Sequence, residues 1–361
     1  MIKPKHLNKG DKIAIVSLSS GLLGENSCKH QLSLGISRLK AFGLIPVFMT
    51  NSLKGINYIS NHPEARAHDL KQAFFDDDIK GILCAIGGDD TYKILPYLLN
   101  DQSFIDQVKK KPKIFMGFSD TTNNHFMFYK LGITTYYGPT FLSDFAELDV
   151  DMLDYTQHAV KSLFKNDCQI KIKSSPMWYE DRLDYSINAL HTPRVSHKET
   201  KGYDVIYGSG KIHGKLLGGC IESIFDAYTG SRYKEQKHIY EKYELMPSIN
   251  EWKDKILFIE TSEEKPQPKQ FESYIDFLST YGIFDVVAAV LIGKPADQKY
   301  DKSYRKILSK YALKHHLPMM CNLNFGHAYP RTILPYGIKA ELDLDDKSLT
   351  IIEHMFEREE R

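Results

Sequence analysis

A serine at the end of an apolar run is the first residue in this sequence that could act as a nucleophile. The segment Ile114-Phe-Met-Gly-Phe-Ser-Asp-Thr-Thr122 passes from a strand-like stretch into Gly-x-Ser-x-Thr and then into a helical pattern. This order resembles the sharp strand–turn–helix bend that exposes a serine hydroxyl, and a helix start supplies free N–H groups and a positive dipole beside it. The alternative is that Ser119 is only a helix N-cap, because the fifth motif position is Thr where hydrolases have Gly.

A nucleophilic serine needs a base, and the base needs an orienting group. Of the 14 histidines, His327 lies in the turn-rich stretch Asn324-Phe-Gly-His-Ala-Tyr-Pro330 after a predicted strand. Glu260 ends the apolar run Ile256–Ile259, where a carboxylate requires a partner. Glu222 is a rival for the acid, and a purely structural role remains an alternative for His327. The order Ser119, Glu260, His327 is shared with α/β-hydrolases, so the order does not separate the two folds.

Paired glycines after another apolar run could supply a second backbone donor. Gly87-Gly88-Asp89-Asp90 follows the strand-like Gly81–Ile86, so its backbone can approach a ligand closely. We expect the N–H groups of Gly88 and Asp120 to form an oxyanion pair. The alternative is a plain turn in which Asp89 or Asp90 caps the next helix. The sequence has no metal-ligating cluster or Walker loop, so it predicts neither a metal nor a nucleotide cofactor.

The elements around these residues predict an α/β fold. In the first half, near-continuous apolar runs alternate with helical patterns, which is typical of a parallel sheet covered on both faces. The expected strands are 12–17, 44–49, 81–86 and 113–116, and the expected helices are 31–42, 63–75, 91–99 and 121–131. Ligands of such sheets bind beyond the carboxyl ends of the strands, so the loops after Ile86 and Met116 should line a site.

The pattern breaks down between residues 167 and 209, which we interpret as a linker with a substrate-facing loop. This divides the chain into an N-terminal α/β domain (1–166) with the nucleophile, the linker (167–209), and a C-terminal domain (210–361) with the acid and base. Tyr203–Tyr207 and Lys211–His213 are expected to pair as a hairpin. Later strands are expected at 255–259, 286–292 and 319–323, and helices at 221–228, 271–281 and 304–315. A closing hairpin is expected around Asp345-Asp346.

Composition excludes several classes of protein. The chain has 361 residues, 42% of them hydrophobic, and a formal net charge of +1, which favours neither a nucleic-acid polymer nor an anionic membrane as a partner. No apolar stretch is long enough to span a membrane, and the N-terminus lacks the pattern of a signal peptide. The five cysteines (Cys28, Cys84, Cys168, Cys220, Cys321) never form a C-x-x-C pair. We therefore expect a cytoplasmic protein with reduced thiols.

Taken together, the motifs resemble one family, the LD-carboxypeptidases (muramoyl-tetrapeptide carboxypeptidases), and within it the branch of the microcin C immunity proteins. The matching segments occur in the family's order and cover nearly the whole chain: Ala85-Ile-Gly-Gly-Asp-Asp-Thr91, Met116-Gly-Phe-Ser-Asp-Thr-Thr122, Tyr137-Gly-Pro139, Gly214-Lys-Leu-Leu-Gly-Gly-Cys220, Ile256-Leu-Phe-Ile-Glu-Thr-Ser-Glu-Glu264, Gly293-Lys-Pro295 and Phe325-Gly-His327.

The resemblance implies a metal-independent serine peptidase with Ser119 as nucleophile, Glu260 as acid and His327 as base. It also implies an N-terminal domain like class I glutamine amidotransferases, a C-terminal domain with a small β-structure, and a homodimer. The tetrapeptide-cleaving enzymes tend to follow the paired glycines with Tyr or Asn and another Gly, whereas Asp89-Asp90 stand here. That departure is closer to the immunity-protein branch, whose members hydrolyse an amide that joins an aminoacyl group to a nucleotide-like portion.

Three functions follow from this reading. The first choice is hydrolysis of a murein tetrapeptide at its L,D bond, which releases D-Ala in cell-wall recycling. The second is cleavage of a microcin C-type peptidyl-nucleotide antibiotic in self-protection; Asp89 would then contact the substrate, and Trp178 would stack on adenine or cover the site. Trp178 could equally be a surface aromatic packed on the hinge. The third is a non-catalytic ligand-binding protein, against which the intact candidates at all three triad positions argue.

Overall fold

Each of the two units of this protein is built from more than one stretch of the chain. In the computed structural model, which describes residues 1–167 and 169–358, unit 1 comprises Met1–Asn166, Arg182–Arg194 and Phe356–Arg361. Unit 2 comprises Asp167–Asp181 and Val195–Met355. Residues 167–209 therefore contribute to both units, and Cys168 lies outside the described residues.

The apolar runs of the first half form a parallel sheet in unit 1, as predicted. Its strands are β1 (Lys12–Val16), β2 (Ile45–Phe48), β3 (Ile79–Cys84), β4 (Ile114–Gly117) and β5 (Tyr136–Tyr137), in the spatial order β5-β4-β3-β1-β2. Every pair in this series is parallel. The chain leaves β1 toward β2 on one side and leaves β3 toward β4 on the other. The adjacent strands β1 and β3 therefore form a topological switch point, where α/β sheets bind ligands beyond the strand ends.

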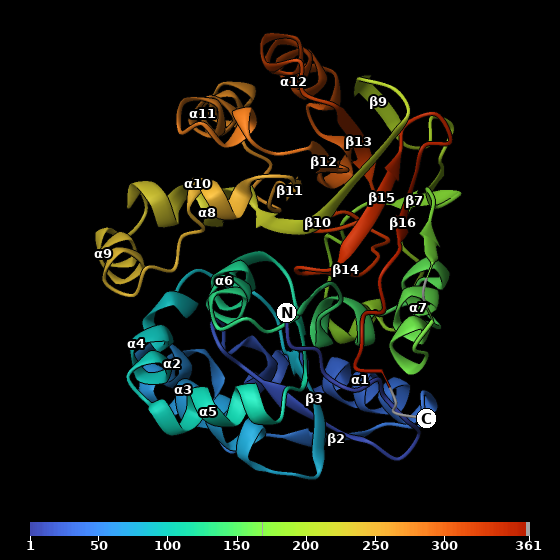
Figure 1. Ribbon diagram of the computed structural model, residues 1–361. Coiled ribbons are helices and arrows are strands. Elements are labelled where there is room, and N and C mark those ends of the chain that lie inside the picture. Colours follow the sequence, from blue (N-terminus) through green and yellow to red (C-terminus); the bar gives the residue numbers. More distant parts are fainter. Residues whose placement is uncertain (168, 359–361) are drawn as a thin grey trace. The chain divides into compact units, whose positions relative to one another are not determined.

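Helices cover both faces of this sheet. They are α1 (Lys29–Ala41), α2 (Gly55–Asn61), α3 (Pro63–Phe75), α4 (Leu95–Leu99), α5 (Gln102–Lys110), α6 (Thr122–Lys130) and α7 (Asp154–Lys161). In Figure 1, α1 lies on one side of β1–β3 and α3 and α5 lie on the other. Covered on both sides, the strands bury nearly continuous apolar side chains, for example Ala14, Ile15 and Val16, which are 0% exposed.

Ion pairs connect the segment 182–194 to the rest of unit 1. The buried Glu147 carboxylate accepts from Arg182 Nη2 and Arg194 Nε, each at 2.6 Å. All three side chains are at most 6% exposed. Burial alone would raise the pKa of Glu147, but the two guanidinium groups outweigh it and hold that pKa below its usual range. Paired in this way, charges can be buried without an isolated carboxylate being left in the interior.

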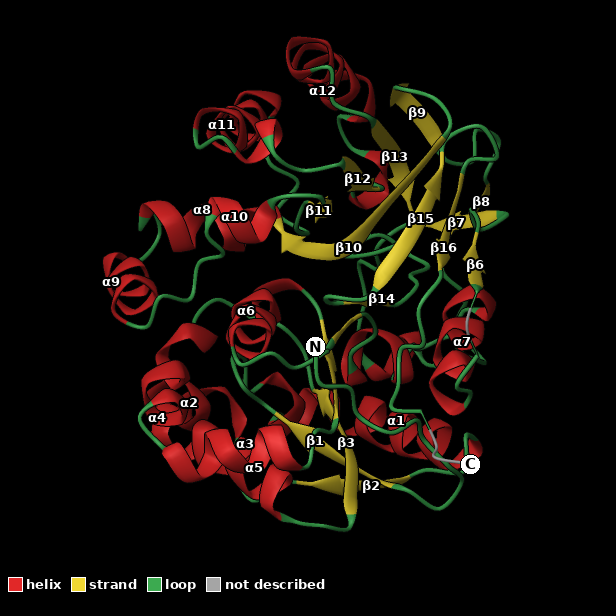
Figure 2. Ribbon diagram, in the orientation of Figure 1, coloured by secondary structure: helices red, strands yellow, loops and turns green. Residues whose placement is uncertain are grey.

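Unit 2 contains a mixed sheet with a parallel centre. Its spatial order is β6 (Ile170–Ile172), β16 (Ser348–Ile351), β15 (Lys339–Asp343), β10 (Lys211–Cys220), β11 (Lys255–Glu260), β12 (Ala289–Gly293), β13 (Met319–Leu323) and β9 (Asp204–Tyr207). The neighbours from β10 to β13 are parallel, and β15 and β16 form the expected closing hairpin. Figure 2 shows the mixed strand and helix content of both units.

The hairpin expected from Tyr203–Tyr207 and Lys211–His213 is wrong. β9 pairs antiparallel with β13 at one edge of the sheet, whereas β10 is an inner strand between β15 and β11. The two strands are adjacent in sequence and both read as short apolar runs, so the local pattern fits a hairpin. Three other strands lie between them in the sheet, an arrangement that depends on long-range packing rather than on the turn residues.

Helices of unit 2 flank its sheet. They are α8 (Ile221–Thr229), α9 (Lys234–Lys242), α10 (Ile249–Trp252), α11 (Pro268–Thr280) and α12 (Asp301–His315). Of these, α9 is packed on α8. The remaining strands are β14 (Leu334–Pro335) and the pair β7 (Met177–Tyr179) and β8 (Ser196–Lys198). Figure 1 shows α11 and α12 side by side next to β12 and β13. Residues of α11 and α12, among them Ile275, Leu278 and Leu308, bury their side chains in this layer.

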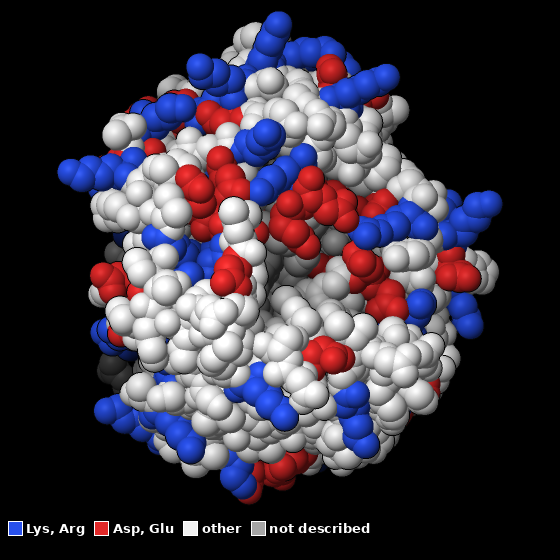
Figure 3. Space-filling model, turned by 180° about the vertical axis from the view of Figure 1, so that it is seen from behind, with Lys and Arg blue, Asp and Glu red and all other residues white. Residues whose placement is uncertain are grey.

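Basic and acidic side chains are distributed differently on the face drawn in Figure 3. Lys and Arg side chains are scattered over it, whereas many of the Asp and Glu side chains gather around its middle. Within the described part of the chain, no helix has both the length and the apolar character needed to cross a membrane.

Candidate active site

The bend after β4 gives Ser119 an unusual backbone conformation. β4 ends at Gly117, a short 3₁₀ turn covers Ser119–Thr121, and α6 begins at Thr122. Ser119 has φ +64°, a left-handed value that is uncommon outside glycine and costs backbone free energy. The N-cap positions belong to Phe118 and Thr121, so the structure does not support the alternative that Ser119 is the N-cap. We call residues 117–120 the elbow.

The paired glycines pack directly against the elbow. A Cβ on Gly87 would lie 2.9 Å from Ser119 Cβ and 3.1 Å from its Oγ, closer than a side chain is tolerated. Gly88 has φ +151°, and a Cβ there would lie 2.4 Å from Ser19 Oγ. A side chain at either position would displace a neighbouring group. The absence of a side chain at both glycines therefore lets the backbone of this loop lie directly beside Ser119. This is the arrangement expected of a backbone anion site.

Asp120 ties three segments of unit 1 together through its buried carboxylate. Its Oδ2 accepts from Ser19 Oγ at 2.7 Å and from the backbone N–H of Thr91 at 2.8 Å, and its Oδ1 accepts from Asn123 Nδ2 at 2.7 Å. Burial raises the pKa of Asp120 to about 6, although these hydrogen bonds favour the ionised form. The carboxylate thereby fixes the loop after β3 against the elbow. The sequence analysis assigned a role only to the backbone N–H of Asp120, as an oxyanion donor, and none to its side chain.

The two aspartates after the glycines differ in their surroundings. Asp89 is exposed. Asp90 occupies the N-cap position of the 3₁₀ turn Thr91–Ile94 without a side-chain cap. Its carboxylate instead pairs with Arg66 at 2.6 Å and Lys93 at 3.0 Å. The capping role considered for Asp90 is therefore not what the structure shows.

In unit 2, Glu260 and His327 are in contact, as the sequence analysis required of an acid–base pair. Glu260 is the last residue of β11 and is 1% exposed. Its Oε2 lies 2.8 Å from His327 Nδ1 and also accepts from the His327 backbone N–H at 3.1 Å. Gly326 has φ +78°, and a Cβ there would lie 2.2 Å from Glu260 Cδ. Glycine at this position therefore allows the histidine loop to approach the carboxylate closely.

A second carboxylate, which the sequence analysis did not single out, contacts the other ring nitrogen. Glu263 Oε2 lies 2.8 Å from His327 Nε2. Burial alone would lower the pKa of His327, but Glu260 and Glu263 outweigh it and raise the pKa to about 10. The hydrogen bond to His327 in turn lowers the pKa of Glu263 to about 2. Nothing in the run Glu263-Glu264 distinguishes the two residues in sequence, because only the turn after β11 decides which one faces the ring.

The remaining acidic groups near this pair form a hydrogen-bonded cluster. Cys220 Sγ, a Glu260 oxygen and a His327 nitrogen lie within 4.8 Å of one another, a spacing that a metal ion could bridge. However, Cys220 donates to Glu222 Oε2 at 3.2 Å, and burial raises the pKa of its thiol well above the usual value. A protonated thiol is a poor metal ligand. Glu222, the rival acid, accepts from the backbone N–H and the hydroxyl of Ser262.

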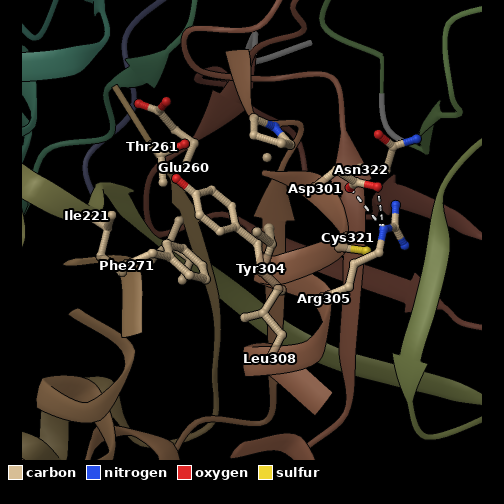
Figure 4. Close-up of a pocket in the computed structure, with 14 residues that line it drawn as sticks. Ile221, Glu260, Thr261, Phe271, Asp301, Tyr304, Arg305, Leu308, Cys321 and Asn322 are labelled. Carbon is tan, nitrogen blue, oxygen red and sulfur yellow. Dashed lines mark hydrogen bonds and ion pairs between the residues drawn. The ribbon is translucent and has the colours of Figure 1, made fainter. Parts of the chain in front are cut away.

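Beneath Glu260 lies a cavity of about 10 Å³, room for a single water molecule. Figure 4 shows Glu260 and Thr261 at one end of it and Asp301 and Arg305 at the other, with the Tyr304 ring between them. Its walls are mostly apolar side chains from α11, α12 and the parallel strands. The cavity is too small for a peptide or nucleotide, so it is a gap in the packing next to Glu260 and not a substrate-binding site.

Trp178 lies in β7, where it stacks on a histidine of the neighbouring strand. Its ring and that of His197 in β8 are 4.1 Å apart at 16°. Lys294 Nζ lies 6.0 Å from the Trp178 ring centroid and forms a buried ion pair with Glu199. Trp178 itself remains half-buried. The predicted irregular loop thus contains a short two-stranded element that holds the aromatic side chain in a defined orientation.

The mixed α/β architecture, with a parallel sheet in the first unit and a second α/β unit, agrees with the match of this chain to a family of peptidases. The LD-carboxypeptidase N-terminal domain matches residues 13–138, and the LD-carboxypeptidase C-terminal domain matches residues 213–342. The chain therefore belongs to the LD-carboxypeptidase family, which makes it a serine-type carboxypeptidase by class. The predicted family and fold class are confirmed.

The similar proteins include MccF-like proteins and a protein named as a murein peptide carboxypeptidase. An MccF-like protein from Streptococcus pneumoniae, crystallised in complex with AMP, is 47% identical with a TM-score of 0.91, covering 95% of this chain and 99% of that one. The microcin C7 self-immunity protein MccF of Escherichia coli is 28% identical over 97% of this chain and 95% of its own. The "Probable murein peptide carboxypeptidase" of Bacillus subtilis is 26% identical over 97% and 94%.

Proposed function

We propose that this protein hydrolyses an amide bond by a serine mechanism in which Ser119, His327 and Glu260 are nucleophile, base and acid. Ser119 Oγ attacks the carbonyl carbon while its proton passes to His327 Nε2. The C–N bond of the tetrahedral intermediate then breaks, and the leaving nitrogen takes that proton. Water, deprotonated by the same ring, releases the acyl group from Ser119 as a carboxylic acid. The 2.8 Å contact between Glu260 and His327 Nδ1 carries this proposal, because it orients the ring through Nδ1 and so assigns proton transfer to the other nitrogen, Nε2.

The oxyanion of this intermediate would be bound by the N–H groups of Gly88 and Asp120. Support comes from the packing of Gly87 against Ser119 and from the hydrogen bonds of Asp120 to Ser19 and Thr91, which hold the glycine loop against the elbow. A donor of this kind contributes about 10²–10³ in turnover. Preorganisation is the physical basis of that gain, because the dipoles are already oriented before charge develops.

For the substrate, we favour an aminoacyl or peptidyl group joined to a nucleotide through an amide-like bond, which reverses the order of preference drawn from the sequence. The AMP complex of the 47%-identical relative supports this choice. So does Trp178, whose half-buried ring, held by His197, could stack on a purine. Asp89, exposed beside the glycine loop, would contact the same substrate. The murein tetrapeptide remains the second candidate, supported by the Bacillus subtilis relative.

Hydrolysis assays with two substrates test both parts of the proposal. Purified protein is incubated with an aminoacyl-sulfamoyl adenosine and, separately, with a murein tetrapeptide. We expect nucleoside release from the first to be the faster reaction. Ser119→Ala should abolish hydrolysis and preserve the fold, and Ser33→Ala, which removes an exposed hydroxyl on α1, should not change the rate. D-Ala release alone would establish the murein function instead, and full activity of Ser119→Ala would refute the serine mechanism.

We also propose that the protein forms a homodimer, as the family resemblance implies. Light scattering coupled to size-exclusion chromatography gives the mass directly. A mass near twice 41.5 kDa is expected, and a mass equal to that of one chain at micromolar concentration would contradict it.

A further inference from the structure

Each ring nitrogen of His327, the proposed base, contacts a carboxylate. Glu260 lies 2.8 Å from Nδ1, and Glu263 lies 2.8 Å from Nε2. A neutral imidazole has one N–H donor and one acceptor nitrogen, whereas an ionised carboxylate only accepts. Both contacts can be hydrogen bonds only if the ring donates from both nitrogens. The arrangement therefore describes an imidazolium, which has no lone pair to receive a proton from a serine.

We propose that Glu263 holds His327 in a resting state by occupying Nε2, and that this carboxylate must leave the ring before Ser119 can transfer its proton. The inference rests on the proposed function, in which His327 is the base. On release, Glu263 departs as a carboxylate and the Nε2 proton passes to water or buffer. The ring is then neutral, with Nδ1–H donated to Glu260 and a lone pair on Nε2.

The burial of the two carboxylates indicates which one can leave. The Glu260 side chain is 0% exposed, accepts from the His327 backbone N–H at 3.1 Å, and is packed against Gly326 and Gly293. The Glu263 side chain is 63% exposed. Moving Glu263 into water keeps its charge solvated, whereas moving Glu260 would break a packed contact and leave a charge buried. Glu260 is thus the permanent partner of the ring, and Glu263 is the exchangeable one.

The other ionisable groups near the ring act on its two carboxylate partners. Cys220 lies beside Glu260 and His327, and the buried Glu222 interacts electrostatically with Glu260. Tyr336 also interacts electrostatically with Glu260, and Arg232 acts on Glu263. Of these groups, only Arg232 brings positive charge near the exchangeable carboxylate. The surroundings are consistent with the raised pKa of His327, to about 10.

Two neighbouring glutamates provide a matched pair of variants. Glu263→Gln removes the charge that contacts Nε2, and Glu264→Gln removes the same charge from a side chain of nearly equal exposure, 62%, which faces Arg232. The pKa of His327 is measured by NMR of histidine-labelled protein, with His327→Gln used to assign its signal. We expect this pKa to fall by at least one unit in Glu263→Gln and to stay unchanged in Glu264→Gln.

A second measurement links the ring to the nucleophile without using the substrate. A neutral fluorophosphonate labels an activated serine, and intact mass gives its rate. Since each unit of pKa changes the neutral fraction of the ring about tenfold near pH 7, Glu263→Gln should be labelled roughly tenfold faster than wild type, and Glu264→Gln at the wild-type rate. Equal pKa values and equal labelling rates in the two variants would overturn the resting-state role. No labelling of Glu263→Gln, with the pKa shift intact, would instead overturn Ser119 as nucleophile.

Discussion

Neutralising the buried carboxylate beside the nucleophile should change how stability depends on pH. Burial raises the pKa of Asp120 from 3.8 to about 6, and its oxygens accept from Ser19, Thr91 and Asn123. A carboxyl whose folded-state pKa is raised stabilises the fold below its unfolded-state pKa and loses that contribution as pH rises through the folded-state value. The full difference of about 2 pKa units corresponds to about 3 kcal/mol, at roughly 1.4 kcal/mol per unit.

Only part of this contribution falls in the range where measurement is convenient. Between pH 5 and pH 7 the linkage relation gives a loss of roughly 1 kcal/mol in the free energy of unfolding of wild type. Asp120→Asn cannot titrate, so it should lack this loss. The stability of wild type relative to the variant should therefore fall by roughly 1 kcal/mol from pH 5 to pH 7. Guanidinium denaturation of both proteins at pH 5, 6 and 7 measures the difference directly.

Asp89→Asn is the matched control for this experiment. It removes one carboxylate from an exposed position in the loop that Asp120 holds, and its stability relative to wild type should not vary over this range. If the gap between wild type and Asp120→Asn were equally constant from pH 5 to pH 7, Asp120 would not be a buried carboxylate with a raised pKa. The inference that burial outweighs the hydrogen bonds and raises the pKa of Asp120 would then be wrong.

Two further substitutions probe the supports of the site. Gly326→Ala places a Cβ 2.2 Å from Glu260 Cδ, so it should destabilise the protein by about 1–3 kcal/mol and reduce the amount by which Glu260 raises the pKa of His327. Gly210→Ala is the control for backbone strain alone, because Gly210 has φ +74° and open space around it. Equal effects of the two variants in denaturation and NMR would contradict the packing argument. Glu147→Gln should lower the free energy of unfolding by about 3–5 kcal/mol, because it leaves two buried guanidinium groups poorly paired. Limited proteolysis of this variant should then cut within 182–194. An uncut segment would show that the ion pairs do not hold it.

Several elements could be predicted from the sequence because their signals are local. Pro63–Phe75 and Met319–Leu323 have the same bounds in sequence and structure, since a proline at a helix start and a short apolar run are sufficient signals. The hairpin at 203–213 was wrong because strand partners are chosen by the whole sheet. Helices such as α9 were not predicted because they are rich in charged residues and contain too few apolar ones to mark a buried face.

What the sequence determined by itself was the chemistry available: a serine after a buried strand, a glutamate at a strand end, a histidine in a glycine-containing loop, and motifs that identify the family. Only the tertiary structure decided that Glu260, rather than Glu222, contacts His327, and that Glu263, rather than Glu264, occupies its other nitrogen. The physical reason is that a contact between residues 67 positions apart depends on the register of strands and the path of turns. Side-chain type limits which partners are possible, and packing selects among them.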